Sequence, residues 1–393
     1  MEMDATAALP IWANALLGYR PLAPRASLGA SRDPPRHCFH YASGAQRATT
    51  RRREAKLQMS QHPATAKSDA RQRGLVRGFS VLAGLTLCLI VVGALVRAHD
   101  AGLACPDWPL CTGAIVPQFD VKIAFEWGHR VFAALISFGL LGLSILVLRD
   151  SALRQRMGVQ LGLCWLVLCA QVIFGALTVW LLLAPWTVSV HLVLGNTFCM
   201  ALLWISRDLT DSSSSSVAPA SIAPPVTGLI VLAAVCLVAQ IVLGGLVSSH
   251  YAGLACTEFP TCDGERFVPT LQGALGLHVL HRLNGYALAA VFTLLAVVSR
   301  HTGRIDRLAA LACGLVWLQV GIGVTNVLMR IPYQVTGLHT GVGAVIVLTT
   351  SLMVREIVHA RSARPRAREA RRDEGRARRL PIVGRGIHSE IAR

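Results

Sequence analysis

The 393-residue sequence is apolar and basic: 53% of its residues are hydrophobic, 15% are charged, and the formal net charge is +17. A soluble domain carries roughly a quarter charged residues, so the composition excludes an ordinary soluble protein and predicts an all-α polytopic membrane protein. The excess Arg lies mainly in two tails, residues 1–77 and 355–393, which is typical of cytoplasmic segments that flank a membrane. Basic and aromatic residues are not interleaved as base stacking requires, so we expect no nucleic-acid partner.

The first 73 residues carry many Arg and few acidic residues. This composition resembles a mitochondrial transit peptide, and an equally good interpretation is that translation begins at Met59. In either case we expect residues 1–77 to be a basic, disordered segment outside the fold.

Eight apolar runs follow, each close to the about 20 residues that a helix needs to cross a bilayer. They span about 78–97, 121–148, 157–182, 187–206, 226–248, 273–299, 308–329 and 335–355. A Ser- and Pro-rich stretch, residues 208–225, separates the first four runs from the last four and predicts a flexible linker. The expected domains are therefore an N-terminal four-helix half (78–207), a C-terminal four-helix half (226–355) and a basic C-terminal tail (356–393).

Basic loops predict the orientation in the membrane. Arg residues cluster between the second and third runs and between the sixth and seventh, at Arg149, Arg154, Arg156, Arg300, Arg304 and Arg307. Because Lys and Arg accumulate in cytoplasmic loops, both termini are expected inside. The long loops after the first and fifth runs then face the bacterial periplasm or the mitochondrial intermembrane space.

The two halves repeat one another in the same orientation. Residues Gly93 to Cys105 align with Gly244 to Cys256 at an offset of 151, and Gln171 to Gly175 align with Gln319 to Gly323 at an offset of 148. A parallel repeat of four helices suggests two tandem four-helix bundles related by a pseudo-twofold axis along the membrane normal.

Four histidines recur at equivalent places in this repeat: His129 and His191 in the first half, His281 and His339 in the second. Ionisable residues at membrane depth are costly and mark functional sites. A single such histidine is more simply a hydrogen-bonded core residue, but four at matched depth favour cofactor ligation. No cysteine or further carboxylate joins them at ligand spacing, which weakens a zinc or di-iron site. Two imidazoles that face each other across a bundle suit a haem iron.

Charged neighbours flank one histidine in each half. Arg130 and Arg282 follow His129 and His281 directly, and a guanidinium group can pair with haem propionates. Three residues before the histidine, the first half has Glu126. A carboxylate beside a cofactor can accept a proton or stabilise a developing cation, and the alternative is a salt bridge to Arg130 at i, i+4. We favour the chemical role, in which the first half reacts and the second transfers electrons.

The second half has His278 where the first has Glu126, and it shares the helix face of His281. It can support a ligand rather than act as one. Two Cys-x5-Cys pairs lie in the equivalent outer loops: Cys105 and Cys111, and Cys256 and Cys262. An outside location permits disulfides, whereas two thiols per loop make a poor metal site. Two roles stay open for these pairs. Each disulfide can be purely structural, or the first can act in redox chemistry and accept electrons from a reaction at the first haem.

With these residues placed, the chain closely resembles the haem A synthase family from about Gly78 to Arg355. The motifs that carry the resemblance are Asp100 to Cys111, Glu126-x-x-His129-Arg130, His191, His281-Arg282 and His339. The resemblance implies an oxidoreductase of eight helices in two similar halves. It would oxidise a ring methyl of haem O to a formyl group through hydroxylated intermediates, for terminal oxidase assembly. The N-terminal half would hold substrate haem O between His129 and His191.

In the C-terminal half the same resemblance implies a haem b ligated by His281 and His339, the His-Arg match favouring His281 over His278. It also implies Glu126 as the catalytic carboxylate and Cys105 and Cys111 as a pair that assists catalysis. We expect two disulfides, Cys105–Cys111 and Cys256–Cys262.

A haem O synthase is the expected supplier of substrate, and a homo-oligomer is compatible with the sequence. We expect the chain in a bacterial inner membrane, with the mitochondrial inner membrane as the alternative. Two competing hypotheses remain. One is a dihaem membrane cytochrome that carries electrons without modifying haem, and the other is a transporter built on a parallel repeat.

Overall fold

The computed structural model describes residues 43–118, 120–211, 222–300 and 302–379. Most of the segments predicted to be disordered or flexible, residues 1–42, 212–221 and 380–393, lie outside the described residues. The chain divides into two compact units, Met1–Pro63 and Ala64–Arg393. The second unit contains all the apolar spans found in the described part of the chain.

The structure is helical, as the composition predicts. The long helices are α1 (Ser43–Ala98), α2 (Val121–Leu148), α3 (Ser151–Trp180), α4 (Pro185–Asp211), α5 (Pro224–Ser249), α6 (Gly273–Val298), α7 (Arg304–Leu328) and α8 (Tyr333–Arg379). A short 3-10 helix, η2 (Ala252–Leu254), lies in the loop after α5. Within the described residues, eight helices are long and apolar enough to cross a membrane, so the predicted number of spans is confirmed.

Helices α1 and α8 extend beyond the predicted spans. The first begins at Ser43 instead of near Gly78, and the last continues to Arg379 instead of ending near Arg355. Residues 43–77 and 356–379 are therefore helical, which differs from the disorder predicted for residues 1–77 and from the separate tail predicted after Arg355. The physical reason is that Ala, Arg, Gln and Lys are strong helix formers, so these polar and basic segments can continue the helices that they adjoin.

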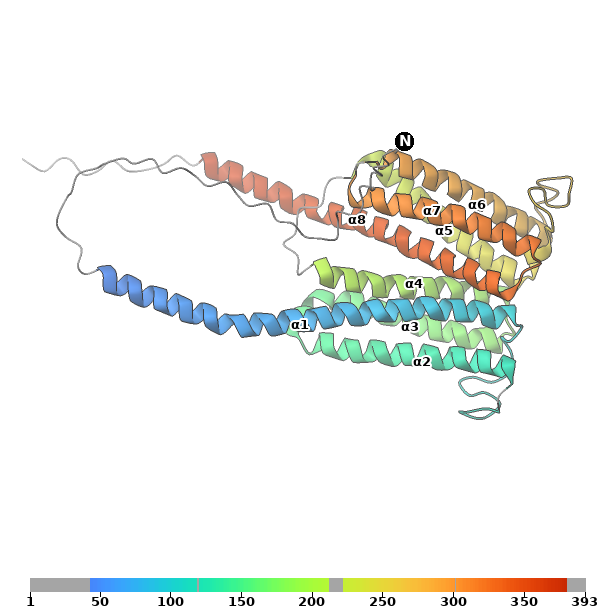
Figure 1. The fold of residues 1–393 in the computed structure, drawn as a ribbon, viewed down its shortest axis with the longest axis horizontal. Coiled ribbons are helices and arrows are strands. Elements are labelled where there is room, and N and C mark those ends of the chain that lie inside the picture. The colour runs from blue at the N-terminus through green and yellow to red at the C-terminus, as the bar shows by residue number, and fades with distance from the viewer. Residues whose placement is uncertain (1–42, 119, 212–221, 301, 380–393) are drawn as a thin grey trace, which may run out of the picture. The chain divides into compact units, whose positions relative to one another are not determined.

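Helices α1 to α4 follow one another in the chain and α5 to α8 come after them (Figure 1). Each of these two groups has its own hydrophobic core. The first core gathers fully buried side chains from α1 to α4, among them Phe79, Leu140, Cys164 and Leu202. The second gathers side chains from α5 to α8, among them Ile230, Phe292, Ala309 and Met353. Two cores agree with a chain of two four-helix halves. The pseudo-twofold relation between the halves stays a prediction.

The two halves are joined mainly through α4. At one end, the Arg355 side chain of α8 is only 2% exposed and pairs with Asp208 and, at 2.7 Å, with Asp211 of α4. Further along, a Cβ on Gly245 of α5 would lie 3.2 Å from the Cα of Ser189 of α4. Glycine therefore lets these two helices approach closely.

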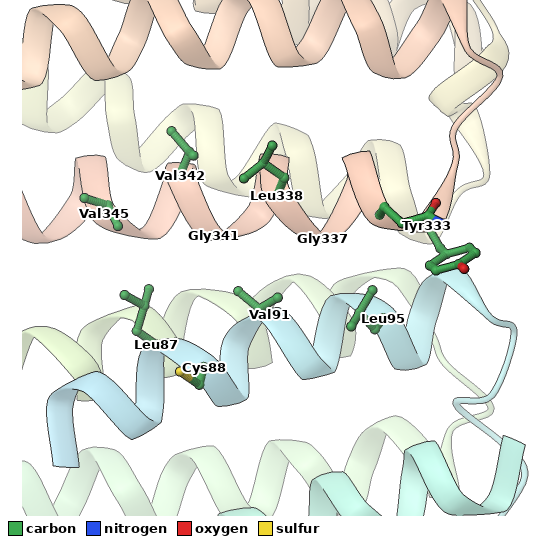
Figure 2. A pocket seen from close by; sticks show the side chains of 11 residues that line it. Leu87, Cys88, Val91, Leu95, Tyr333, Gly337, Leu338, Gly341, Val342 and Val345 are labelled. Atoms are coloured by element: carbon green, nitrogen blue, oxygen red, sulfur yellow. The ribbon is translucent and has the colours of Figure 1, made fainter. Parts of the chain in front are cut away.

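Between α1 and α8 the halves leave a groove of about 550 Å³ with an apolar lining. Figure 2 shows Val91 and Leu95 of α1 opposite Gly341 and Gly337 of α8, with Tyr333 at one end. The ring of Tyr333 packs against His99, at 4.6 Å between ring centroids.

Candidate functional site

Each of the four predicted histidines packs against a glycine of the preceding helix. A Cβ placed on that glycine would lie 3.1–3.2 Å from the Cε1 atom of the ring. The pairs are His129 with Gly93, His191 with Gly175, His281 with Gly244, and His339 with Gly323. We call each pair, with the two helices that carry it, a histidine site. A larger side chain in place of the glycine would displace the ring, so the glycines set how deeply the histidines lie.

In the C-terminal half the two histidine sites face each other. The ring centroids of His281 and His339 are 6.5 Å apart, and the ring planes are inclined by 60°. A metal–imidazole bond is about 2 Å long and a ring nitrogen lies roughly 1 Å from the centroid, so two imidazoles on opposite sides of one metal have centroids about 6 Å apart. The observed separation therefore suits one iron shared by both rings. In the N-terminal half His129 lies on α2 and His191 on α4.

Three of these rings carry a buried nitrogen without a partner in the described structure: Nδ1 of His129, of His281 and of His339. Nδ1 of His191 lies 3.1 Å from the carbonyl oxygen of Gln171. Buried polar atoms are nearly always paired, so an unpaired one calls for an explanation such as an absent ligand. Among the described residues no group of three or more His, Cys, Asp or Glu gathers to hold a metal ion. Paired imidazoles in apolar bundles fit a haem iron.

Glu126 lies on α2 one turn before His129 and is 5% exposed. Its carboxylate accepts a hydrogen bond from the backbone N–H of Cys105 at 2.8 Å and another from Arg130 at 2.5 Å. Cys105 forms a disulfide with Cys111 in the same outer loop. The salt bridge considered in the sequence analysis is thus present, and the same carboxylate also holds the disulfide loop against α2.

The C-terminal half repeats this arrangement with a histidine in place of the carboxylate. The backbone N–H of Cys256 donates to Nδ1 of His278 at 3.3 Å, and Cys256 forms a disulfide with Cys262. His278 is therefore engaged with the outer loop, while His281 faces His339. These contacts favour His281 over His278 as the iron ligand.

Arg130 and Arg282 complete the attachment of the two loops. Arg130 donates to the carbonyl oxygens of Asp107 (2.7 Å), Leu110 (2.7 Å) and Cys105 (3.1 Å). Arg282 donates to those of Glu258 (3.0 Å), Thr261 (3.1 Å) and Cys256 (3.1 Å). Both terminal nitrogens of each guanidinium group are used, so pairing with propionates would require some of these bonds to exchange. That pairing stays a prediction.

The first outer loop is held together by Asp107. Its carboxylate accepts the backbone N–H groups of Gly113 at 2.7 Å and of Thr112 at 2.6 Å. The bond from Gly113, aided by that from Thr112, lowers the pKa of Asp107 below its usual value. Gly113 has a φ of 75°, in the left-handed region that favours glycine.

Three glutamines that were given no role from the sequence contact these histidines. Nε2 of Gln171 lies 3.3 Å from Nε2 of His191. Gln240 donates to the carbonyl of His281 at 3.1 Å, and Gln319 donates to that of His339 at 2.8 Å. The signal that could have found them is the spacing Gln-x3-Gly, which occurs at 171–175, 240–244 and 319–323.

A protein-family model described as "Cytochrome oxidase assembly protein" matches residues 79–125 and 116–352. The match covers more than half of the chain and includes all four histidine sites and both disulfide loops. The chain belongs to the cytochrome oxidase assembly protein family.

Curated relatives in this family carry the name Heme A synthase. The chain is 29% identical to the Shewanella oneidensis protein over 307 residues, which is 67% of this chain and 91% of the relative. It is 28% identical to a Methylobacterium sp. (strain 4-46) protein over 372 residues, 77% of this chain and 96% of the relative. It is 33% identical to the Symbiobacterium thermophilum protein over 287 residues, 66% of this chain and 88% of the relative.

Proposed function

We propose that this protein is a haem A synthase. In this proposal it is a membrane oxidoreductase that converts haem O to haem A by oxidising a ring methyl to a formyl group through hydroxylated intermediates. The family match and the names of the relatives support the assignment. The observation that carries it is a difference between two similar histidine pairs: a buried carboxylate stands beside His129, and a histidine stands at the same place beside His281.

The C-terminal pair, His281 and His339, would hold a haem b. Their 6.5 Å centroid separation and the unpaired nitrogens support this role. A haem b held there would supply electron transfer, because its iron cycles between two oxidation states. The protein contributes the apolar bundle, the two imidazoles, and a loop closed by His278 and Arg282 at the end of α6.

The N-terminal pair, His129 and His191, would hold the substrate haem O. Glu126 shares the helix face of His129, since the two are three residues apart. Its carboxylate can accept a proton or stabilise positive charge as the methyl group is oxidised. The bonds from Cys105 and Arg130 hold that carboxylate in one position. The Cys105–Cys111 disulfide lies one hydrogen bond away and is a candidate electron acceptor.

We also propose a bacterial inner-membrane location with both termini in the cytoplasm, and a haem O synthase as the source of substrate. The bacterial origin of the relatives supports this location over the mitochondrial alternative. This location would place the product, haem A, in the membrane where a terminal oxidase is assembled. A homo-oligomer stays a prediction.

The test compares Glu126→Ala with Glu258→Ala, which removes an exposed carboxylate of the other outer loop. Each full-length variant is co-expressed with a haem O synthase, and the extracted haems are identified by mass. Glu126→Ala should accumulate haem O without haem A while the purified protein keeps its haem b spectrum, and Glu258→Ala should still make haem A. Unchanged haem A in Glu126→Ala would contradict the catalytic assignment.

Two outcomes would overturn the proposed function itself. A wild-type protein that binds haem in both halves and never yields haem A or a hydroxylated form would indicate a dihaem cytochrome. A purified protein with no haem absorbance would favour the transporter hypothesis.

A further inference from the structure

The loop before α2 is attached to two faces of that helix. On one face, Glu126 and Arg130 hold the part of the loop that contains Cys105. On a neighbouring face, the indole N–H of Trp127 donates to the backbone carbonyl of Ile115 at 2.8 Å. The loop therefore turns back beside the beginning of α2 (Figure 1).

Trp127 lies on the face of α2 that points away from the protein core. Phe138 and Ile145 follow it by three and five helical turns, so the three residues share one face. Phe138 and Ile145 are 69% and 42% exposed, whereas Ile136, on the opposite face, is buried. Because α2 is long and apolar enough to cross a membrane, its exposed apolar face contacts acyl chains in a bilayer.

The depth of Trp127 matches the boundary between headgroups and acyl chains. A helix of 28 residues is about 42 Å long, and the hydrocarbon core of a bilayer is about 30 Å thick. When α2 is centred, about 6 Å of it lies outside this core at each end. Trp127 is about 9 Å from the first residue of α2, close to the edge of the core, where tryptophan is enriched in membrane proteins.

The segment that Trp127 holds at this depth is apolar and exposed. Ile115 and Val116 are 80% and 63% exposed, and no charged residue occurs between Thr112 and Gln118. Acyl chains would remove these two aliphatic side chains from water, which is favourable. The direction, the depth and the composition of the segment therefore all suit contact with lipid.

The second outer loop carries an equivalent pair, Phe267 and Val268, which are 66% and 44% exposed. Each pair is followed by a proline. On α6, however, Val279 takes the place of Trp127 and is buried against the second disulfide. The exposed apolar pair is thus common to both loops, and the indole contact belongs to the first.

We propose that Ile115 and Val116 insert into the adjoining leaflet of the bilayer and that Trp127 is the residue that positions them there. Their partner is lipid, because the segment is bonded to the lipid-facing side of a membrane span. The same loop carries the Cys105–Cys111 disulfide, so the bilayer helps to hold that disulfide against α2. This interaction does not depend on the haem A synthase assignment.

The first experiment identifies what lies next to Ile115. Photo-leucine is incorporated at position 115 of the full chain, and the matched control carries it at Thr112, an exposed residue of the same loop. Each protein is reconstituted into vesicles of phosphatidylethanolamine and phosphatidylglycerol and irradiated, and the adducts are identified by mass. Position 115 should yield lipid adducts, whereas position 112 should yield mainly water adducts.

Two results would overturn the proposal. One is a yield of lipid adducts at position 115 that is no higher than at position 112. The other is a crosslink from position 115 to a second copy of the chain, which would assign the segment to an interface between subunits.

The second experiment removes the indole contact. Trp127→Phe keeps an aromatic ring and loses the N–H group, and Trp186→Phe makes the same change at an exposed tryptophan of α4. Hydrogen exchange of the backbone amides of residues 111–116 is measured in the same vesicles. Trp127→Phe should raise the exchange rate about fivefold, the worth of one net hydrogen bond, and should lower the yield of lipid adducts at position 115. Identical behaviour of the two variants would refute the positioning role of Trp127.

Discussion

The close contact between Gly244 and His281 makes the resident haem site sensitive to a single methyl group. A Cβ on Gly244 would lie 3.2 Å from Cε1 of His281, whereas carbon atoms prefer a separation of about 3.5–4.0 Å. Gly244→Ala must therefore push the imidazole away by a few tenths of an ångström. Gly228, on the same helix, has no heavy atom within 4 Å of the corresponding position, which makes Gly228→Ala a matched control.

The size of the effect follows from the difference between these two variants. Alanine is more favourable than glycine in a helix interior by about 0.8–1.0 kcal/mol, and both variants gain this. Only Gly244→Ala also pays for overpacking, which typically costs about 1–3 kcal/mol. The helix contribution is the same in the two variants. A haem b held by His281 would fix the ring in place, so the overpacking cost would fall on the haem-bound state, where about 1–3 kcal/mol corresponds to roughly a 5- to 150-fold weaker affinity.

The assay is a titration of each haem-depleted protein with haem b in detergent, followed by its absorbance. Circular dichroism verifies that both variants keep the wild-type helix content. Gly244→Ala should bind 5- to 150-fold more weakly than Gly228→Ala. Equal affinity for the two variants, with intact helices, would refute the idea that the glycine sets the position of the ligand.

Three further predictions concern the parts that hold the halves and loops in place. Arg355→Met should lower the stability by about 3–5 kcal/mol, because it removes the buried guanidinium group that pairs with the Asp208 carboxylate, measured as thermal unfolding in detergent. Arg282→Lys should let a reductant open the second loop's disulfide faster, because a single ammonium cannot span the carbonyls that the guanidinium group contacts, measured by trapping free thiols. The pKa of Asp107 is lowered in the folded loop by the N–H of Gly113. The ionised carboxylate therefore stabilises the folded loop at pH values above its ordinary pKa of about 4, and this stabilisation is lost as the pH falls through the lowered pKa. Hydrogen exchange in the first loop should therefore rise at acid pH in the wild type, and Asp107→Asn should remove that pH dependence.

Each of these has a result that would count against it. Arg361 is an exposed arginine of the same helix, and an equal loss of stability in Arg361→Met would show that the buried ion pair is not the cause. An unchanged rate of reduction in Arg282→Lys would mean that the loop is held by its other contacts. A pH dependence of exchange that persists in Asp107→Asn would assign it to another group.

The sequence by itself determined the features that depend on local chemistry and on repetition. Eight apolar runs of sufficient length specify eight helices, because each spanning helix must satisfy its backbone hydrogen bonds within itself. The constant offsets between the halves identified His129, His191, His281 and His339 as equivalent. The two Cys-x5-Cys pairs could be found in the same way, because a disulfide within a short loop needs only neighbouring residues.

Only the tertiary structure decided which side chains meet. The chemistry of Arg130 predicted that it pairs with haem propionates, yet its guanidinium group donates to the carbonyl oxygens of a loop about twenty residues earlier in the chain. Asp208 and Arg355 are 147 residues apart, and only the packing of α4 on α8 brings them together. Gln240 and His281 are 41 residues apart, and only the packing of α5 on α6 brings the Gln240 amide to the His281 carbonyl. Contacts between helices depend on rotation and depth to within a fraction of a turn, and an apolar run in a membrane, where lipid tolerates any apolar face, does not specify either.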